Sequence, residues 1–385
     1  MNLYKCNVNS QFLSLCRGLL RKQHLEKMAD LYDTLAWGRS SKDSKFSQLK
    51  IQRNLPGADD VTFDLKYCGI CHTDVHIANN DWGTTTFPVV PGHELAGVVS
   101  AIGANVTKFK VGDQVGVGCI VDSCLKCKNC NDGVEHICSG KMTMTYDSKI
   151  THGHIKTNSG ITYGGFSTSQ TVNERYLIKI PAEYPLESAG PLFCSAITMY
   201  SPLCHWKAAS GGLNVGVIGI GGLGQMGIML AKAMGNKVTA ISTSPAKQQD
   251  AMEIGADNFI VSTDEASMLS GADTLDLILN TVSANHQIEH YLPLLRRDGS
   301  IVQLGLASKK HEIAQIPLMR KRIQISGSMI GGIPETQDCM DFCAKHKIFS
   351  KIKLVKASEL DHVFSILEQK NDQVVRYVLD IEASK

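Results

Sequence analysis

The densest group of side chains able to do chemistry lies between residues 67 and 94. Two short motifs, CGICHTDVH (68–76) and PGHE (91–94), supply thiols, imidazoles, a hydroxyl and carboxylates. A catalytic zinc ion takes three protein ligands of the Cys, His or carboxylate type and keeps one position open. Cys71 and His93 could supply two of these ligands, so a third must come from elsewhere in the chain.

A second group consists of four cysteines separated by two, two and seven residues. They are Cys124, Cys127, Cys130 and Cys138. Four thiolates at this spacing can surround one zinc ion and leave no position for a substrate. Unrelated thiols or two disulfides are the alternatives. In so polar a segment, however, cysteines at intervals of three residues serve no buried face, and the pattern predicts a structural zinc site.

Cys194 is the candidate for the missing third ligand. It lies in a segment, 186–209, whose pattern predicts a helix. A single cysteine on an apolar helix is more often an ordinary core residue. Only the incomplete ligand set around Cys71 and His93 favours a role in metal binding.

The elements that must position the first motif are predicted to be strands. Val61, Phe63 and Leu65 alternate with polar residues, which indicates a half-buried strand that leads directly into Cys68. Short apolar runs broken by glycine follow between residues 95 and 117, and a further strand is expected near 176–180. This first part of the chain therefore reads as a small, curved β-rich domain.

The composition changes at Leu213, where a buried strand (213–218) precedes a glycine-rich turn and a helix that runs through Met234. A GxGxxG motif in this context is specific for dinucleotides, because the turn brings the pyrophosphate to the helix N-terminus. The predicted cofactor-binding residues here are Gly219, Gly221, Gly222, Leu223 and Gly224. Further strands are expected at 237–242, 258–261, 274–280, 300–304 and 322–328, which predicts a doubly wound parallel sheet.

The end of the second strand of this sheet indicates which dinucleotide binds. An NAD site places an acidic residue there, but no acidic residue occurs between the end of this strand and Asp250. The segment instead offers hydroxyls and a cation that can hold a 2′-phosphate, which favours NADP(H). These residues are Ser242, Thr243, Ser244 and Lys247. Ser244 also fits as a helix cap before Pro245, although capping does not explain the missing acid.

Composition sets the broad class of the protein. At 385 residues the chain is long enough for two domains. A net charge of +2 gives no reason to expect nucleic acid or an anionic membrane as a partner, and no apolar run approaches the ~20 residues that span a bilayer. Thirteen cysteines without a convincing signal peptide favour reduced thiols, metal ligands and a cytoplasmic location.

Residues 1–27 differ from the rest, with five basic residues against one acid, Glu26. Basic, amphipathic and acid-poor segments are typical of mitochondrial presequences. The segment is short and poor in serine for such a peptide, so we favour a disordered extension, or translated sequence upstream of a start at Met28. In either case it is expected to lie outside the fold.

Taken together, CGICHTDVH, VPGHELAGVV, the four-cysteine segment, GIGGLGQMG, GSMIGG and VVRYVLDIE resemble the zinc-dependent medium-chain alcohol dehydrogenases, and in particular the cinnamyl alcohol dehydrogenase subfamily. The resemblance implies an α/β protein in which a Rossmann domain (191–330) interrupts a GroES-like catalytic domain (28–190 and 331–385). It also implies a homodimer formed through the edge of the Rossmann sheet.

The resemblance also implies roles for single residues around the metal. It places the catalytic zinc ligands on Cys71, His93 and Cys194, with Glu94 beside the metal or alternating as a ligand. Asp74 falls on the carboxylate that orients the zinc-bound histidine.

Four further residues receive roles in the same way. Thr73 falls on the hydroxyl that hands on the substrate proton, and His76 on the exit of that proton to solvent. Asp81 would extend this relay. His72 falls on the residue that faces the cofactor phosphates.

The implied reaction is hydride transfer between NADP(H) and a primary alcohol or aldehyde, helped by zinc as a Lewis acid. Lignin-forming members carry a tryptophan soon after the fourth cysteine of the four-cysteine segment, whereas this chain has Lys141-Met142-Thr143-Met144 there. It also has a bulky residue, Trp82, near the pocket. We therefore expect a broad aromatic and medium-chain aliphatic aldehyde reductase. A polyol dehydrogenase of the mannitol type and a non-catalytic NADPH-binding relative are the alternatives.

Overall fold

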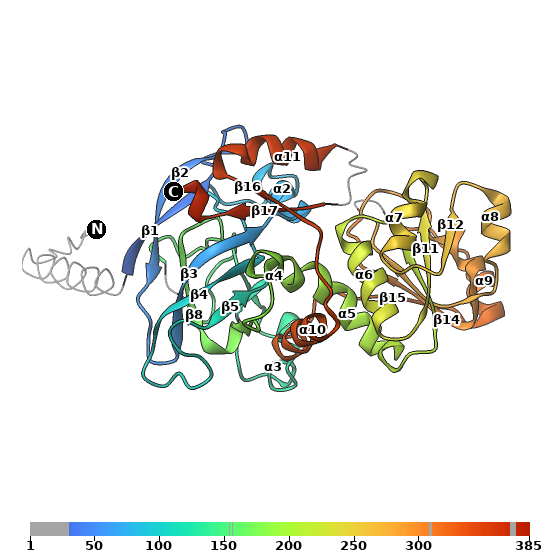
Figure 1. Cartoon of the computed structure of the whole chain (residues 1–385), viewed down its shortest axis with the longest axis horizontal. Coiled ribbons are helices and arrows are strands. Elements are labelled where there is room, and N and C mark those ends of the chain that lie inside the picture. Colours follow the sequence, from blue (N-terminus) through green and yellow to red (C-terminus); the bar gives the residue numbers. More distant parts are fainter. Residues whose placement is uncertain (1–30, 154, 156, 308–309, 370–374) are drawn as a thin grey trace, which may run out of the picture.

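The computed structural model describes residues 31–385 apart from 154, 156, 308–309 and 370–374. The chain forms two units side by side (Figure 1). The β-rich unit combines the blue and green N-terminal half with the red C-terminal elements, and the parallel-sheet unit contains the yellow and orange segment between them. Across the described residues, every helix is too short or too polar to cross a membrane.

The β-rich unit is built around a seven-stranded sheet with the path β16-β17-β3-β4-β5-β9, in which β8 also pairs with β3. Its strands are β3 (Asp60–Gly69), β4 (Leu95–Ile102), β5 (Gln114–Val117), β8 (Ser169–Asn173), β9 (Ile178–Lys179), β16 (Ile352–Val355) and β17 (Arg376–Asp380). Val61, Phe63 and Leu65 of β3 are buried, which confirms the predicted strand before the first motif.

Two small antiparallel pairs complete the strands of this unit. They are β1 (Leu31–Gly38) with β2 (Ser47–Asn54), and β6 (Ile120–Asp122) with β7 (Thr143–Met144). Short helices carry the motifs between the strands: α2 (His72–Ala78), α3 (Lys128–Asn131), and the 3-10 turns η1 (Glu135–Ile137) and η2 (Glu174–Tyr176).

The parallel-sheet unit has the strand order β12-β11-β10-β13-β14-β15. This is the 3-2-1-4-5-6 order of doubly wound dinucleotide-binding folds, so the predicted fold class is confirmed. Its strands are β10 (Asn214–Ile218), β11 (Lys237–Ser242), β12 (Asn258–Val261), β13 (Leu275–Asn280), β14 (Leu295–Gln303) and β15 (Gln324–Gly327). The connections contain α6 (Gly222–Ala233), η5 (Pro245–Lys247), α7 (Gln248–Glu253), α8 (Glu265–Ser270), η6 (Ile288–Leu294) and α9 (Gln315–Lys321).

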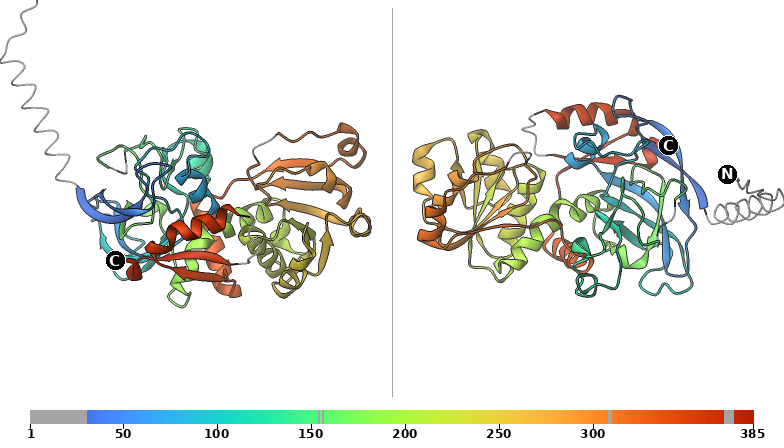
Figure 2. Two further views of the ribbon diagram at one scale, coloured as in Figure 1. Left: turned by 90° about the horizontal axis from the view of Figure 1, so that it is seen from above. Right: turned by 180° about the vertical axis from the view of Figure 1, so that it is seen from behind.

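After β15 the chain returns to the β-rich unit through α10 (Ile333–His346), β16, η7 (Ala357–Glu359) and α11 (Leu360–Glu368), and ends with β17 and η8 (Glu382–Ser384). Strand β17 pairs antiparallel with β3, with Val378 opposite Gly69. Both views of Figure 2 show these red elements within the β-rich unit. The C-terminal segment is therefore a central part of the sheet that carries the first motif.

The helix predicted over residues 186–209 is wrong as a single helix. The structure has α4 (Leu186–Ala189), the 3-10 turn η3 (Gly190–Phe193), α5 (Ser195–His205) and the 3-10 turn η4 (Ala208–Ser210). Gly190 and Pro191 at the start of η3 are both poor helix formers, and Gly190 also lies so close to the Glu94 carbonyl that a Cβ there would overlap it. Cys194 stands at this break, with φ −125° and ψ −67°, instead of within a helix.

Helix α5 connects the two units. It packs against α6 of the parallel-sheet unit and against α10 of the return path. One group of buried residues extends from Ala96 in β4 through Ile197 in α5 to Val215 in β10, so the two units share part of their core. The domain boundaries predicted near residues 190 and 330 remain predictions, and the segment 1–27 lies outside the described residues.

Candidate active site and metal centres

Four of the predicted donors come together between the two units. One ligand atom from each of Cys71, His93, Glu94 and Cys194 lies within 4.8 Å of all the others. His93 Nε2 is 3.3 Å from Cys194 Sγ, and the Sγ atoms of Cys71 and Cys194 are 3.9 Å apart. Two thiols and an imidazole are the donor types that bind zinc. The arrangement therefore fits a zinc ion held by side chains from distant parts of the chain.

The start of α2 positions the first of these donors. Cys71 is the N-cap residue, and its backbone N–H donates to Asp74 Oδ2 at 2.7 Å, which forms a capping box. The other oxygen of Asp74 accepts from Gly92 N at 3.1 Å and lies 3.3 Å from His93 Nδ1. One fully buried carboxylate thus fixes both the cysteine backbone and the orientation of the imidazole.

The electrostatics of the cluster favour an ionised thiol. A hydrogen bond from Cys194, with Arg376 and His93 nearby, lowers the pKa of the Cys71 thiol well below its usual value. The thiolate is the form of cysteine that binds metal. The donor set is therefore chemically suited to the ion that its residue types indicate.

Glu94 is held by a residue that the sequence pattern did not single out. Arg376 in β17 forms two hydrogen bonds with the Glu94 carboxylate, one of them from Nε at 3.3 Å. Burial is the main cause that raises the pKa of Glu94, and Arg376 opposes this rise. A Cβ built on Gly222 would lie 3.5 Å from the Arg376 guanidinium, so Arg376 lies close to the glycine-rich turn as well as to the donor cluster.

The predicted relay residues lie on one side of α2. Thr73 Oγ1 is 3.6 Å from Cys71 Sγ, and His76 follows three residues later on the same helix face. His76 Nδ1 is 2.7 Å from Asp81 Oδ2, where both side chains are partly exposed to solvent. The His72 ring lies 4.7 Å from the His76 ring, and the Trp82 ring lies 5.4 Å from the His76 ring.

Two further residues near the donors were not predicted. Tyr146 stacks on the His93 ring at a centroid distance of 5.8 Å, and the Cys119 thiol lies 4.0 Å from the Phe193 carbonyl. Both side chains are buried. The sequence holds no spacing signal for either residue, because loops distant from both motifs place them here.

The four lobe cysteines also come together, with all four Sγ atoms within 4.8 Å of one another. Cys127 caps the short helix α3, and its sulfur accepts a hydrogen bond from Cys130 N at 3.5 Å. Hydrogen bonds from backbone N–H groups, Cys130 N first, lower the pKa of Cys127 to about 6. These residues therefore offer four sulfur donors, with at least one readily ionised thiol, which is the set that a structural zinc ion takes.

The glycine-rich turn has the geometry needed for a pyrophosphate. Gly219 has φ +86°, which favours glycine, and a Cβ on Gly224 would overlap the Gly219 carbonyl. A Cβ on Gly221 would meet no atom within 4 Å, so there is open space in front of α6. The first amides of this 12-residue helix face that space, with Leu223 in its first turn.

The segment predicted to hold a 2′-phosphate borders the same turn. Ser242 ends β11, and its hydroxyl accepts a hydrogen bond from Ser244 N at 3.1 Å. Thr243 follows, and its carbonyl accepts from Thr263 Oγ1 at 3.5 Å. Ser244 is the N-cap residue of η5 but makes no side-chain capping hydrogen bond. Lys247 Nζ lies 3.4 Å from the Ile220 carbonyl, within the glycine-rich turn.

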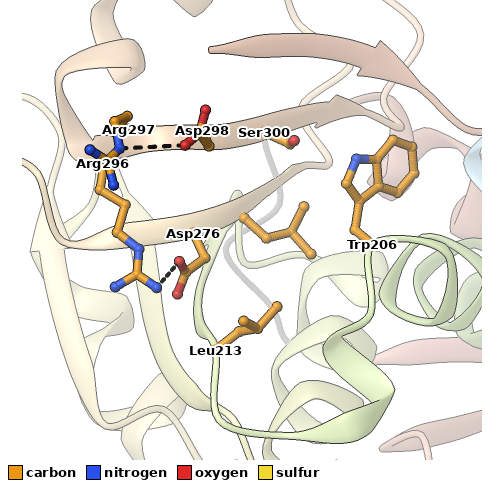
Figure 3. A pocket seen from close by; sticks show the side chains of 8 residues that line it. Trp206, Leu213, Asp276, Arg296, Arg297, Asp298 and Ser300 are labelled. Atoms are coloured by element: carbon orange, nitrogen blue, oxygen red, sulfur yellow. Dashed lines mark ion pairs between the residues drawn. The ribbon is translucent and has the colours of Figure 1, made fainter. Parts of the chain in front are cut away.

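A cavity of about 550 Å³ lies elsewhere, at the amino-terminal ends of the strands of the parallel sheet (Figure 3). Trp206 and Leu213 are among the apolar residues that line it. Its charged side chains are paired: Arg296 contacts Asp276, and Arg297 Nε is 3.4 Å from Asp298. Ligands of such folds bind at the carboxyl ends of the strands, whereas this cavity borders the amino ends of β10 and β13. It is therefore not the dinucleotide site.

Comparisons with known proteins agree with this geometry. The profile of the alcohol dehydrogenase GroES-like domain matches residues 57–182, and that of the zinc-binding dehydrogenases matches residues 222–345. The chain is 43% identical to NADP-dependent alcohol dehydrogenase C 1 of Mycolicibacterium smegmatis, over 90% of this chain and 97% of that protein. It is also 43% identical to a probable mannitol dehydrogenase of Medicago sativa, over 90% and 95% of the two chains.

Among solved structures, the cinnamyl alcohol dehydrogenase (CAD) of Helicobacter pylori complexed with NADP(H) superposes with a TM-score of 0.84 at 35% identity. The match covers 92% of this chain and all of that one. The donor cluster, the sulfur lobe, the dinucleotide turn and the nearly full-length similarity all lead to one conclusion. This chain belongs to the zinc-binding alcohol dehydrogenase family.

Proposed function

We propose that the protein is a zinc-dependent alcohol dehydrogenase that uses NADP(H) to reduce aldehydes to primary alcohols and catalyses the reverse reaction. The observation that carries this proposal is the position of Arg376, which binds Glu94 in the donor cluster and lies beside the turn at Gly222. Hydride transfer needs the metal-bound substrate and the nicotinamide side by side, and Arg376 lies close to both of the sites that would hold them.

The catalytic metal would be held by Cys71, His93 and Cys194, with Glu94 beside it. A zinc ion in this position acts as a Lewis acid that polarises an aldehyde oxygen or lowers the pKa of an alcohol. Asp74 would keep the His93 ring oriented, in the manner of the carboxylates that support zinc-bound histidines. A second, structural zinc ion would be held by Cys124, Cys127, Cys130 and Cys138.

The chain also offers a path for the proton. In aldehyde reduction the carbonyl carbon would receive hydride from bound NADPH, and the oxygen would receive a proton from the Thr73 hydroxyl. His76 lies on the same face of α2, and its contact with Asp81 at 2.7 Å links this face to solvent. The proton that Thr73 loses would be replaced along this route.

The cofactor would lie across the carboxyl ends of β10 and β11. Its pyrophosphate would face the amides at Gly221, Gly222 and Leu223, and His72 would face the phosphates from the β-rich unit. The 2′-phosphate would be held by Ser242, Thr243, Ser244 and Lys247. No acidic residue lies between the glycine-rich turn and Asp250 to repel it.

We further propose that the substrates are aromatic or medium-chain aliphatic aldehydes. Trp82, with 47% of its surface exposed, lies beside His76 and offers a large apolar contact. The similarity to a probable mannitol dehydrogenase keeps a polyol as the second candidate. A polyol requires several polar groups in the pocket, because an unpaired polar group of the site or substrate costs binding energy.

The test is oxidation of NADPH by the purified protein in the presence of cinnamaldehyde, benzaldehyde, hexanal or fructose. NADH in place of NADPH and added zinc chelator serve as controls. Chelator-sensitive turnover of the aldehydes, faster with NADPH, supports the proposal. Turnover of fructose alone would move the assignment to polyols, and NADPH binding without any turnover would contradict a role in this reaction.

A further inference from the structure

The route by which the chain returns from the parallel sheet passes directly over the sulfur lobe. We call residues 328–332, between β15 and α10, the crossover, and residues 124–138 the lobe. The crossover begins at the carboxyl end of β15, and dinucleotides bind at the carboxyl ends of the strands of such sheets. A Cβ on Gly332 would overlap the carbonyl oxygen of Gly133, so the backbones of crossover and lobe are in contact.

Glu135 makes this contact specific. Its side chain is 1% exposed, and Oε2 accepts a hydrogen bond from the backbone N–H of Ile333, the first residue of α10, at 3.1 Å. The first amides of a helix have no partner within the helix, and a carboxylate there is also favoured by the helix dipole. A lobe residue thus caps the helix that begins the return path.

The other oxygen of Glu135 ties this cap to the cysteines. Oε1 accepts hydrogen bonds from Arg175 Nε at 3.2 Å and Nη2 at 3.1 Å. Arg175 Nη2 also donates to the carbonyl of Cys130 at 2.6 Å. A continuous chain of hydrogen bonds therefore runs from a lobe cysteine through Arg175 and Glu135 to the start of α10.

The crossover is also strained and packed near the donor cluster. Ile330 has φ +45°, a conformation that a β-branched residue rarely adopts and that persists only where the surroundings impose it. Its side chain packs on a buried group formed by Cys119, Ile120 and Tyr176, which Cys194 also contacts. The lobe on one side and the Cys194 region on the other hold the crossover in this conformation.

From these contacts we propose that Glu135 is a positioning residue for the cofactor: it fixes the crossover, and through it the alignment of the parallel sheet with the donor cluster. The lobe then has a role in cofactor binding in addition to its own stability. This inference rests on the proposed function, because it takes NADP(H) as the ligand of the parallel-sheet unit.

The experiment compares the full-length variants Glu135→Ala and Glu135→Gln with the wild type. Alanine removes the cap and the ion pair, whereas the glutamine carbonyl can still accept from Ile333. Asp132→Asn is the matched control, since Asp132 lies in the same lobe and pairs only with the exposed Lys128 in the described structure. NADPH affinity is measured by calorimetry, the fold by thermal unfolding, and the crossover by hydrogen exchange of peptides that contain residues 328–336.

We expect Glu135→Ala to weaken NADPH binding about tenfold, as for the loss of a hydrogen bond to a charged group. The KM for NADPH should change more than kcat. Exchange across residues 328–336 should accelerate in this variant, while Glu135→Gln and Asp132→Asn stay close to wild type. Unchanged NADPH affinity in a folded Glu135→Ala protein overturns the proposal. So does an equal loss of affinity in Asp132→Asn.

If Glu135→Ala fails to fold, Glu135→Asp provides a milder comparison, because its side chain is one methylene shorter and cannot reach both Ile333 N and Arg175. Faster exchange of the crossover with weaker NADPH binding supports the proposal, and slower turnover without either change refutes it. A wild-type protein that does not bind NADPH contradicts the proposed function instead. The exchange rates of the crossover still show in that case whether Glu135 holds it.

Discussion

The buried Asp74 carboxylate accepts hydrogen bonds from the backbone of Cys71 and Gly92 and lies beside the His93 imidazole. These contacts explain why an acid stands three residues after Cys71. The same side chain starts α2, closes the loop before His93 and orients a donor. A short motif can specify this much of the site because most of the partners are close to one another in sequence.

Lys247 provides the sharpest test at the scale of one residue. We expect Lys247→Glu to raise the KM for NADPH at least about tenfold, because it replaces a cation beside the predicted 2′-phosphate with an anion. The KM for NADH should change far less. Steady-state kinetics with both cofactors check this, with Lys237→Glu, at the far end of β11, as the control. An equal effect on NADPH and NADH would refute the assignment.

The sequence predicts the donor residues better than it predicts their support. Cys71, His93 and the four lobe cysteines are visible in short spacings, and Cys194 follows from the need for a third ligand. Arg376 has no such signal, since it lies 282 residues from its partner Glu94. Tyr146 likewise reaches His93 from a distant loop. Contacts of this kind depend on the tertiary fold and not on local pattern.

At the scale of elements, the parallel strands were predictable because each is a short apolar run between turns. Strands β11 and β12 begin and end at the predicted residues. The break before Cys194 was missed although Gly190 and Pro191 are poor helix formers. The close approach of Gly190 to the Glu94 carbonyl has no signal in the local sequence.

The lobe is an element whose folding should depend on its metal. Structural zinc sites contribute on the order of 10 kcal/mol to the folding of small modules, so a lost ligand has a large effect. We expect Cys130→Ser to give a poorly folded protein with a lower midpoint of thermal unfolding. Cys204→Ser, which changes a half-buried cysteine outside both donor groups, should behave like the wild type. A well-folded Cys130→Ser protein with two zinc ions per chain would contradict the structural role of the lobe.

At the scale of the whole molecule, strand β15 ends the parallel sheet, and its outer edge is unpaired in the described structure. Such edges invite pairing with a second chain. Ile316 and Met319 of the adjacent α9 are 61% and 74% exposed, which is unusual for large apolar side chains near an unpaired edge. These features agree with the homodimer that the family resemblance implies, in which the edge strands of two copies would meet.

We expect Ile316→Asp combined with Met319→Asp to convert a dimer into a monomer, because each charge would be buried at the interface. Sedimentation velocity measures the change in mass. Leu269→Asp alters another exposed apolar residue, on α8 and away from this edge, and should leave the mass unchanged. A wild-type protein that sediments as a monomer, or a double variant that stays dimeric, would rule out this interface.

The position of β17 beside β3 also determines when the active site can form during synthesis. Residues 376–380 leave the ribosome after the entire parallel sheet. They nevertheless include Arg376, which holds Glu94, and they pair with β3, the strand that precedes Cys71. The donor cluster of a nascent chain therefore lacks this arginine until the whole parallel sheet has been synthesised. Emergence of β17, and not of the first motif, sets the earliest moment at which Glu94 can be held as it is in the folded protein.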